Sequence, residues 1–176
     1  MTEPAVLDKL ESLQRELEST GADIKSVERR NVHFTVRFLG EVTESQAKEA
    51  DSRLRSLELH RASVELKGVG AFPGARDPRV VWVGVSSVDE DKVASIATPV
   101  IRALGGLGER DDRPFRAHAT IARLRSRGVS AALASLISSN SGLPFGQVLL
   151  SKLKLKSSQL TPQGPIYTDL GEYALS

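Results

Sequence analysis

The chain has 176 residues, 40% of them hydrophobic, so it is long enough to bury a core as one domain or as two closely joined lobes. Its 24 basic and 22 acidic residues leave a net charge of +2, which is too small for general attraction to polyanions but allows local basic surface. The absence of cysteine excludes disulfides, thiolate metal sites and a cysteine nucleophile. No stretch approaches 18 apolar residues, and we expect a cytoplasmic protein with no membrane segment.

Hydrophobic periodicity predicts four elements in the first half of the chain. They are a helix over residues 2–19, a strand over 32–38, a helix over 43–60 and a strand around 64–69. Thr43 and Gln46 stand at the spacing of a capping box, which predicts the start of the second helix. The segment AFPGARDP that follows is rich in turn residues, and we expect a loop there.

The second half is predicted to contain six elements. They are a strand over 80–85, a helix over 87–104, a strand over 116–124, a short helix over 130–137, and strands over 148–156 and 166–175. Pro99 is expected to kink or shorten the helix that contains it. Ser130 is expected to cap the short helix, because serine accepts a hydrogen bond from the first backbone amides.

Both halves, about 1–78 and 79–176, run helix, strand with His-x-Thr, helix, strand, which indicates a duplicated unit within one two-lobed domain over 1–176. The second copy has one more strand, because 80–85 precedes its helix while nothing comparable precedes the helix near Pro4. The pattern therefore predicts that an N-terminal strand is absent. A missing strand leaves neighbouring backbone groups unpaired, so we expect reduced stability or strand exchange between chains, with the oligomeric state open.

Two of only three histidines stand two residues before a threonine, in the units His33-Phe34-Thr35-Val36 and His118-Ala119-Thr120-Ile121. On a strand, residues i and i+2 project to the same face, so each imidazole is expected beside a hydroxyl that can donate to a phosphoryl oxygen. A single histidine on a strand is more often a surface or core residue than a functional one. The repetition of the pattern favours function.

Imidazole both accepts and donates protons near neutral pH, so a pair of histidines can act as base and acid in a displacement at phosphorus. This chemistry needs no metal and no cofactor. Metal binding by the histidines is the competing interpretation, but the chain lacks cysteine and an HExxH pattern. We therefore expect a metal-independent phosphodiesterase.

The segments HFTVRFLGEV, GVGAFP, PRVVWVGV, RPFRAHATIARL and SQLTPQGPIY occur in that order over nearly the whole chain. They resemble the two-histidine phosphoesterase superfamily, and within it the RNA 2',3'-cyclic phosphodiesterase branch, historically called 2'-5' RNA ligase. The resemblance implies an α+β fold with two pseudo-symmetric lobes, whose antiparallel-rich sheets flank a central cleft. It also implies hydrolysis of a terminal 2',3'-cyclic phosphate to a 2'-phosphate, with reversible 2'-5' joining of RNA as a side activity.

Matched to the family pattern, His33 and His118 are the catalytic histidines, and Thr35 and Thr120 contact the phosphate. By the same resemblance His33 is the general acid and His118 the base. The family usually has leucine after each threonine, where this chain has Val36 and Ile121, and usually opens with a strand that this chain lacks.

Three further residues are expected to contact RNA, namely Arg37, Phe72 and Arg123. Arg37 shares a face with the first motif, and Phe72 could offer an aromatic plane to a terminal base, although a phenylalanine in a turn more often covers the core. Strict alternation would place Arg123 on the strand face away from His118, so a bulge or a strand end would be needed to bring Arg123 to the face of His118. The arginines of 113–127 and the lysines at 152, 154 and 156 could follow an RNA backbone or be ordinary solvated faces.

Two alternatives stay open. The chain could be a noncatalytic module that binds RNA or nucleotides, or a phosphodiesterase for small cyclic nucleotides. Metal-independent formation of a 2'-phosphate from an oligonucleotide would distinguish the RNA phosphodiesterase from the module, and comparison with mononucleotide substrates would distinguish it from the small-molecule enzyme.

Overall fold

The computed structural model describes residues 3–110, 113–126, 130–161 and 164–176. Its elements in chain order are α1 (Pro4–Ser19), β1 (Ile24–Ser26), the 3-10 helix η1 (Arg29–Asn31), α2 (Glu44–Arg55), β2 (Ala62–Phe72), β3 (Val80–Val85), the 3-10 helix η2 (Ser87–Asp89), α3 (Glu90–Ala103), β4 (His118–Leu124), α4 (Ala131–Ser139), β5 (Pro144–Leu150), β6 (Lys152–Thr161) and β7 (Gly164–Ala174). Helices and antiparallel strands are mixed along the chain, so the predicted α+β class is confirmed. Within the described ranges, no helix is both long and apolar enough to span a membrane.

Contacts divide the chain into two compact units, each assembled from three segments. Unit 1 contains residues 1–35, 63–93 and 116–149, and unit 2 contains 36–62, 94–115 and 150–176. The units therefore do not follow the halves 1–78 and 79–176, because strands from both halves pair in one sheet. Both His-x-Thr motifs belong to unit 1.

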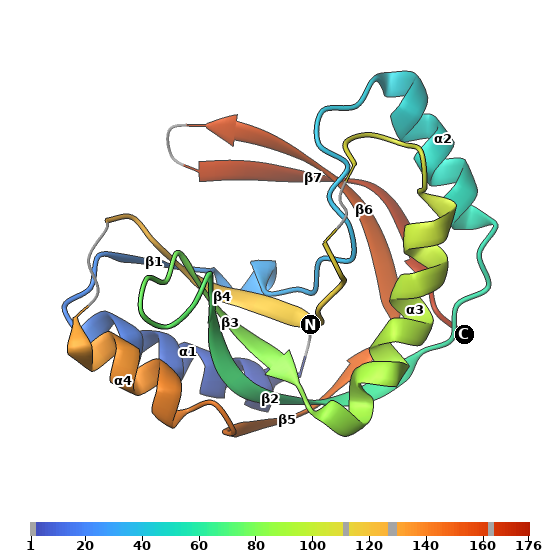
Figure 1. Cartoon of the computed structure of the whole chain (residues 1–176). Coiled ribbons are helices and arrows are strands. Elements are labelled where there is room, and N and C mark those ends of the chain that lie inside the picture. Colours follow the sequence, from blue (N-terminus) through green and yellow to red (C-terminus); the bar gives the residue numbers. More distant parts are fainter. Residues whose placement is uncertain (1–2, 111–112, 127–129, 162–163) are drawn as a thin grey trace. The chain divides into compact units, whose positions relative to one another are not determined.

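Unit 1 is built on a five-stranded sheet with the order β1-β4-β3-β2-β5. The pairs β1 with β4, β4 with β3 and β3 with β2 are antiparallel. Helices α1 and α4 lie on the same side of this sheet (Figure 1). The core between them includes Leu10, Leu17, Val83, Ile121 and Leu133, all almost fully buried.

Unit 2 is built on the long antiparallel hairpin of β6 and β7, which appears in red tones in Figure 1. Its core joins apolar residues of α2, of the second part of α3 and of the C-terminal strand, among them Leu54, Val100 and Tyr173. The Tyr173 hydroxyl donates to Asp51 Oδ1 at 2.7 Å, and Arg55 Nε donates to Asp51 Oδ2 at 2.8 Å. The Tyr173 bond attaches β7 to α2, and the Arg55 bond holds the Asp51 carboxylate within α2.

Several predicted elements are confirmed with small shifts. Thr43 and Gln46 form the predicted capping box, and Ser130 accepts from the backbone N–H of Leu133. α1 is present from Pro4, while residue 2 of the predicted helix lies outside the described residues. α3 continues past Pro99 to Ala103, so the proline does not shorten the helix as expected.

Other predictions about elements are wrong. Residues 32–38 do not form a strand, because Val36 and Leu39 pack against the core of unit 2 while Val32 is buried in unit 1, and no continuous ladder of partners remains. The strand predicted over 148–156 is two strands, β5 in the five-stranded sheet and β6 in the hairpin. Phe72 is the last residue of β2, paired with Val80, and not part of the turn.

Candidate functional site

A single backbone bridge joins the two His-x-Thr motifs. Phe34 pairs with Ala119 of β4 in antiparallel fashion. In antiparallel pairing, the residue before one partner faces the residue after the other, so each histidine faces the threonine of the other motif. The facing pairs are His33 with Thr120 and Thr35 with His118. Directly opposed residues have Cβ atoms roughly 4.5–5.5 Å apart, so the four side chains form one cluster.

Burial supports a common face for this cluster. Ala119 is fully buried on the core side of the sheet, and the side chains that alternate with it point to the opposite side. His33 is exposed, while His118 and the two threonines are half-buried. Two imidazoles and two hydroxyls are thus presented to solvent on one face of unit 1.

The Nδ1 atom of each motif histidine lies next to the backbone carbonyl two residues before it. Nδ1 of His33 lies 2.6 Å from the carbonyl oxygen of Asn31, and Nδ1 of His118 lies 2.7 Å from the carbonyl oxygen of Arg116. A carbonyl oxygen only accepts hydrogen bonds, so Nδ1 carries the proton in both rings. In the neutral tautomer, Nε2 is then the basic nitrogen, and in the charged form Nε2 is an N–H donor.

Two aromatic rings, those of Phe72 and Trp82, lie next to His118. Only Phe72 was predicted from the sequence as a site residue. The Phe72 ring centroid lies 5.0 Å from that of His118 at 85°, and the Trp82 centroid lies 6.0 Å away at 60°. Trp82 pairs with Thr120 in the register of β3 and β4, which places the indole on the same face. From the sequence, Trp82 was predicted only to lie within a strand over 80–85. Its alternation with the buried Val81 and Val83 could have identified it.

Gly70 makes room for the indole. A Cβ at Gly70 would lie 2.2 Å from Cζ2 of Trp82, which is far inside van der Waals contact. The indole Nε1 is buried and, among the described residues, has no hydrogen-bond partner. The contacts of Trp82 with Phe72 and His118 are therefore made by its ring surface.

A bulge in β4 turns Arg123 toward the site. The register runs from Trp82↔Thr120 to Val81↔Ala122, so Ile121 is an extra residue on β4, and Val80 then pairs with Arg123. Val80 and Trp82 are two residues apart on β3 and share a face, so Arg123 shares the face of Thr120. The irregularity that the sequence analysis required is present, and Arg123 is exposed there.

The guanidinium of Arg37 donates hydrogen bonds to backbone carbonyls of unit 2. Its Nη1 donates to the carbonyl of Ile101 at 3.2 Å and its Nη2 to that of Leu107 at 3.4 Å. Its Nε is buried, and no partner for it occurs in the described part of the chain. The structure does not support the expectation that Arg37 contacts phosphate, because the guanidinium holds the end of α3 instead.

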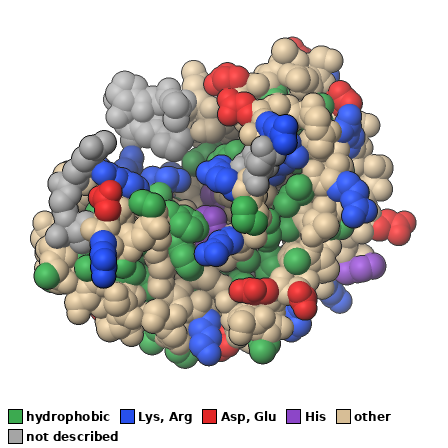
Figure 2. Space-filling view, in the orientation of Figure 1, with side chains coloured by type: hydrophobic (Ala, Val, Ile, Leu, Met, Phe, Trp, Pro, Cys, Tyr) green, Lys and Arg blue, Asp and Glu red, His purple; other side chains and the backbone are tan. Residues whose placement is uncertain are grey.

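The predicted lysine face of β6 is neutralised by β7. Lys154 and Lys156 both bind Asp169, and Lys152 pairs with Glu172 at 3.3 Å. Hydrogen bonds from Lys154 and then Lys156 lower the pKa of Asp169 to about 2. Basic and acidic side chains are also interspersed on the face drawn in Figure 2, where histidine atoms reach the surface. For the basic segment 113–127, residue 127 lies outside the described residues.

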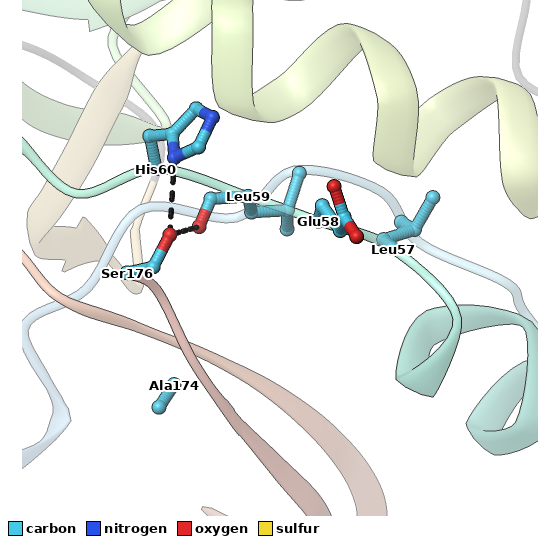
Figure 3. Close-up of a pocket in the computed structure, with 6 residues that line it drawn as sticks. All are labelled: Leu57, Glu58, Leu59, His60, Ala174 and Ser176. Atoms are coloured by element: carbon cyan, nitrogen blue, oxygen red, sulfur yellow. Dashed lines mark hydrogen bonds between the residues drawn. The ribbon is translucent and has the colours of Figure 1, made fainter.

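The third histidine lies elsewhere. His60 borders a pocket of unit 2 formed by Leu57, Glu58, Leu59, His60, Ala174 and Ser176 (Figure 3). Its Nδ1 lies 3.0 Å from the Ser176 hydroxyl, and the side chain is exposed. In the described part of the chain, no group of three or more His, Cys, Asp or Glu side chains is placed to hold a metal ion.

Comparison with known proteins identifies relatives over almost the full chain. The RNA 2',3'-cyclic phosphodiesterase of Aeropyrum pernix is 39% identical over 168 residues, which is 95% of each chain. The protein of the same name from Archaeoglobus fulgidus is 36% identical over 166 residues, covering 94% of this chain and 92% of its own.

Solved structures share the fold. A Thermus thermophilus crystal structure superimposes with a TM-score of 0.74 at 26% identity, over 99% of this chain and 93% of its own. The apo form of E. coli LigT gives a TM-score of 0.77 at 20% identity, over 100% and 94% of the two chains. The resemblance drawn from the sequence is therefore confirmed for the fold.

The family model described as LigT like phosphoesterase matches residues 2–82 and 84–167, which include both His-x-Thr motifs and the strands that carry Trp82 and Arg123. Three findings agree with this match. They are the resemblance in the sequence motifs, the relatives named above and the shared fold. The chain belongs to the LigT-like phosphoesterases, the two-histidine family.

Proposed function

We propose that this chain hydrolyses the 2',3'-cyclic phosphate at the end of an RNA strand to a 2'-phosphate, with both proton transfers made by histidine and without a metal ion. The observation that carries the proposal is the bridge between Phe34 and Ala119, which sets each histidine opposite the threonine of the other motif. The relatives named RNA 2',3'-cyclic phosphodiesterase support the choice of substrate.

In the proposed reaction, a water molecule attacks phosphorus in line with the 3' oxygen. His118 accepts the water proton at Nε2, and the new bond joins the water oxygen to phosphorus. The bond from phosphorus to the 3' oxygen breaks, and His33 donates its Nε2 proton to that oxygen. The products are a 2'-phosphate and a free 3' hydroxyl. The two histidines then exchange protons with solvent, and each transfer contributes about 10² to 10⁴ in rate.

The threonine hydroxyls are assigned to the non-bridging phosphoryl oxygens. Thr35 and Thr120 each lie opposite a histidine, so a phosphate between the imidazoles would be within reach of both. If the 5' hydroxyl of a second RNA replaces water as the nucleophile, the same steps form a 2'-5' phosphodiester. The reverse of this ligation is attack of the 3' hydroxyl on the 2'-5' phosphodiester, which re-forms the cyclic phosphate and releases the 5' hydroxyl.

Arg123 and Phe72 are proposed as substrate contacts. Arg123 is supported by the bulge that brings it to the face of Thr120, and its guanidinium suits a phosphate of the RNA backbone. Phe72 packs against His118, which places its ring beside the proposed cleavage site, where an aromatic ring can contact a base. Arg37 is left out of the proposed site, and cytoplasmic location stays a prediction.

The test is hydrolysis of an oligonucleotide with a 2',3'-cyclic phosphate end in excess EDTA, with products separated against authentic 2'- and 3'-phosphate standards. We expect the 2'-phosphate alone. Binding without turnover would favour the noncatalytic module, and faster turnover of mononucleotides than of oligonucleotides would favour a small-molecule enzyme. Loss of activity in EDTA that a divalent metal restores would overturn the metal-independent mechanism.

The division of roles between the histidines is tested by pH–rate profiles of His33→Ala and His118→Ala. A reaction that needs one neutral and one charged imidazole has a bell-shaped profile. We expect each variant to lose about 10² to 10⁴ in kcat and a different limb of the bell. Loss of the same limb in both variants would refute the split into acid and base.

A further inference from the structure

The two histidines carry the same motif but are supported differently. His118 is the first residue of β4 and pairs there with Gly84 in the continuous ladder between β4 and β3, while β1 pairs with β4 only from Ala122 to Leu124. His33 lies outside the named strands, and the isolated bridge at Phe34 joins its segment to β4. A segment joined to its neighbour at an isolated bridge opens more readily than a residue within a continuous ladder. The position of His33 therefore depends on what precedes it in the chain.

The preceding segment is the 3-10 turn η1. Its backbone closes through the N–H of Asn31, which donates to the carbonyl of Glu28 at 2.7 Å, and through that of Val32, which donates to the carbonyl of Arg29 at 3.3 Å. The carbonyl of Asn31 accepts from Nδ1 of His33 at 2.6 Å. The orientation of this turn thus sets the direction of the His33 ring.

Arg29 attaches the turn to α1. Its Nη1 donates to Asp8 Oδ1 at 2.5 Å and to Glu11 Oε2 at 3.1 Å, and its Nη2 donates to the carbonyl of Pro4 at 3.2 Å. Asp8 and Glu11 are three residues apart on the helix and therefore share a face. The guanidinium is planar and has donors in fixed directions, so three acceptors on one helix hold it in one orientation.

We propose that Arg29 is a positioning residue for His33, acting through η1 and the carbonyl of Asn31, while His118 is held independently by β4. Single exposed ion pairs contribute little to the stability of a protein. Arg29, however, has three acceptors, and its proposed role is only to orient the short turn η1. The inference deepens the proposed function, since its kinetic part rests on His33 taking part in catalysis. Its structural part does not.

The structural part is tested by NMR pH titration of the histidine rings in the full chain, with signals assigned by the three single His→Ala variants. In Arg29→Gln, we expect the His33 signals to shift and broaden while those of His118 stay in place. Arg15→Gln removes the same charge from an exposed position of α1 and is the matched control. Unmoved His33 signals in Arg29→Gln would overturn the proposal, and so would equal movement of both histidines.

A second variant tests the same contacts in case Arg29→Gln folds poorly. Asp8→Asn combined with Glu11→Gln replaces both carboxylates by neutral amides, whose oxygens accept more weakly from a guanidinium, and leaves Arg29 in place. We expect the same selective effect on His33, and a smaller one in Arg29→Lys, because lysine keeps the charge but lacks the planar fork. An effect in Arg29→Gln without any effect in the double variant would contradict the route through α1.

The kinetic part uses cyclic-phosphate hydrolysis. Misplacement of a catalytic group by about 1 Å can cost about 100-fold, so we expect Arg29→Gln to lower kcat roughly 10- to 100-fold with KM little changed. The change should fall on the limb of the pH profile that His33→Ala removes. If the unmodified chain does not hydrolyse the substrate, the proposed function fails, yet the NMR result still decides the role of Arg29.

Discussion

At the scale of single residues, Gly70 makes room for Trp82, one of the two aromatic rings that pack against the His118 ring. Trp82 and Phe72 pack on each other with centroids 5.2 Å apart, and both contact the His118 ring. The indole lies over Gly70, where a side chain would overlap it. Phe72 was predicted from the sequence as a candidate site residue. Gly70 could not be predicted, since the need for glycine arises only from the register that sets Gly70 opposite Trp82.

Gly70→Ala is therefore expected to displace the indole. The rigid ring cannot turn aside as a flexible side chain would, and overpacking of this kind costs about 1–3 kcal/mol. Urea unfolding should show that loss, and NMR should show movement of the His118 signals with little movement of those of His33. Gly74→Ala is the control, because nothing lies within 4 Å of a Cβ there. Equal stability of the two variants would contradict this account of Gly70.

Among the secondary-structure elements, the bulge of β4 is what brings Arg123 to the site. Its extra residue, Ile121, has a carbonyl that accepts from the N–H of Val27 at 2.8 Å and from Nε2 of Gln14 at 2.8 Å. The same Gln14 amide also donates to the carbonyl of Val27 at 2.8 Å. Gln14 is 7% exposed, so this one polar side chain of α1 joins the bulge to the segment that leads toward His33.

Gln14→Leu should keep the volume and lose both hydrogen bonds. The Val27 carbonyl would lose its bond from the amide, and an unsatisfied buried polar group costs about 1–3 kcal/mol. We expect that loss in urea unfolding, together with a raised KM as Arg123 moves. Gln147→Leu, at an exposed glutamine of β5 bonded to Ser63, should change stability by less than about 0.5 kcal/mol. Unchanged stability in Gln14→Leu would show that the bulge does not depend on this side chain.

For the molecule as a whole, ion pairs make the free energy of unfolding depend on pH in the acidic range. Four carboxylates have lowered pKa values because lysine or arginine donates to them: Asp51, Asp89, Asp169 and Glu172. A carboxylate whose pKa is lower folded than unfolded stabilises the fold above its unfolded pKa, near 4, and this contribution is lost as pH falls toward the folded value. For Asp169 the folded pKa is about 2.

We therefore expect stability to fall between about pH 5 and pH 2. Asp169→Asn should lower the urea midpoint at pH 7 and reduce its dependence on pH over that range, because the substituted amide neither titrates nor pairs as a carboxylate. Asp91→Asn, at an exposed position of α3, is the matched control. A midpoint that changes with pH equally in Asp169→Asn and the unmodified chain would contradict this role for the lysine pairs.

The sequence alone determined the family, the α+β class and the two His-x-Thr motifs, since these depend on residue types at fixed short spacing. Helix starts such as Thr43 and Ser130 were also predictable, because a cap is a local interaction. The tertiary structure decided the rest. It divided residues 32–38 between two units, split 148–156 into two strands, and engaged Arg37 with the backbone of α3.

Each of these outcomes depends on a partner distant in the chain. A strand exists only where another strand completes its hydrogen bonds, and an arginine reaches a site only if no nearer acceptors hold it. Trp82, Gly70 and Arg29 matter for the same reason, because their contacts join segments that periodicity treats separately. The pattern along the chain thus identified the groups of the proposed reaction, and the folded contacts decided which residues hold them in place.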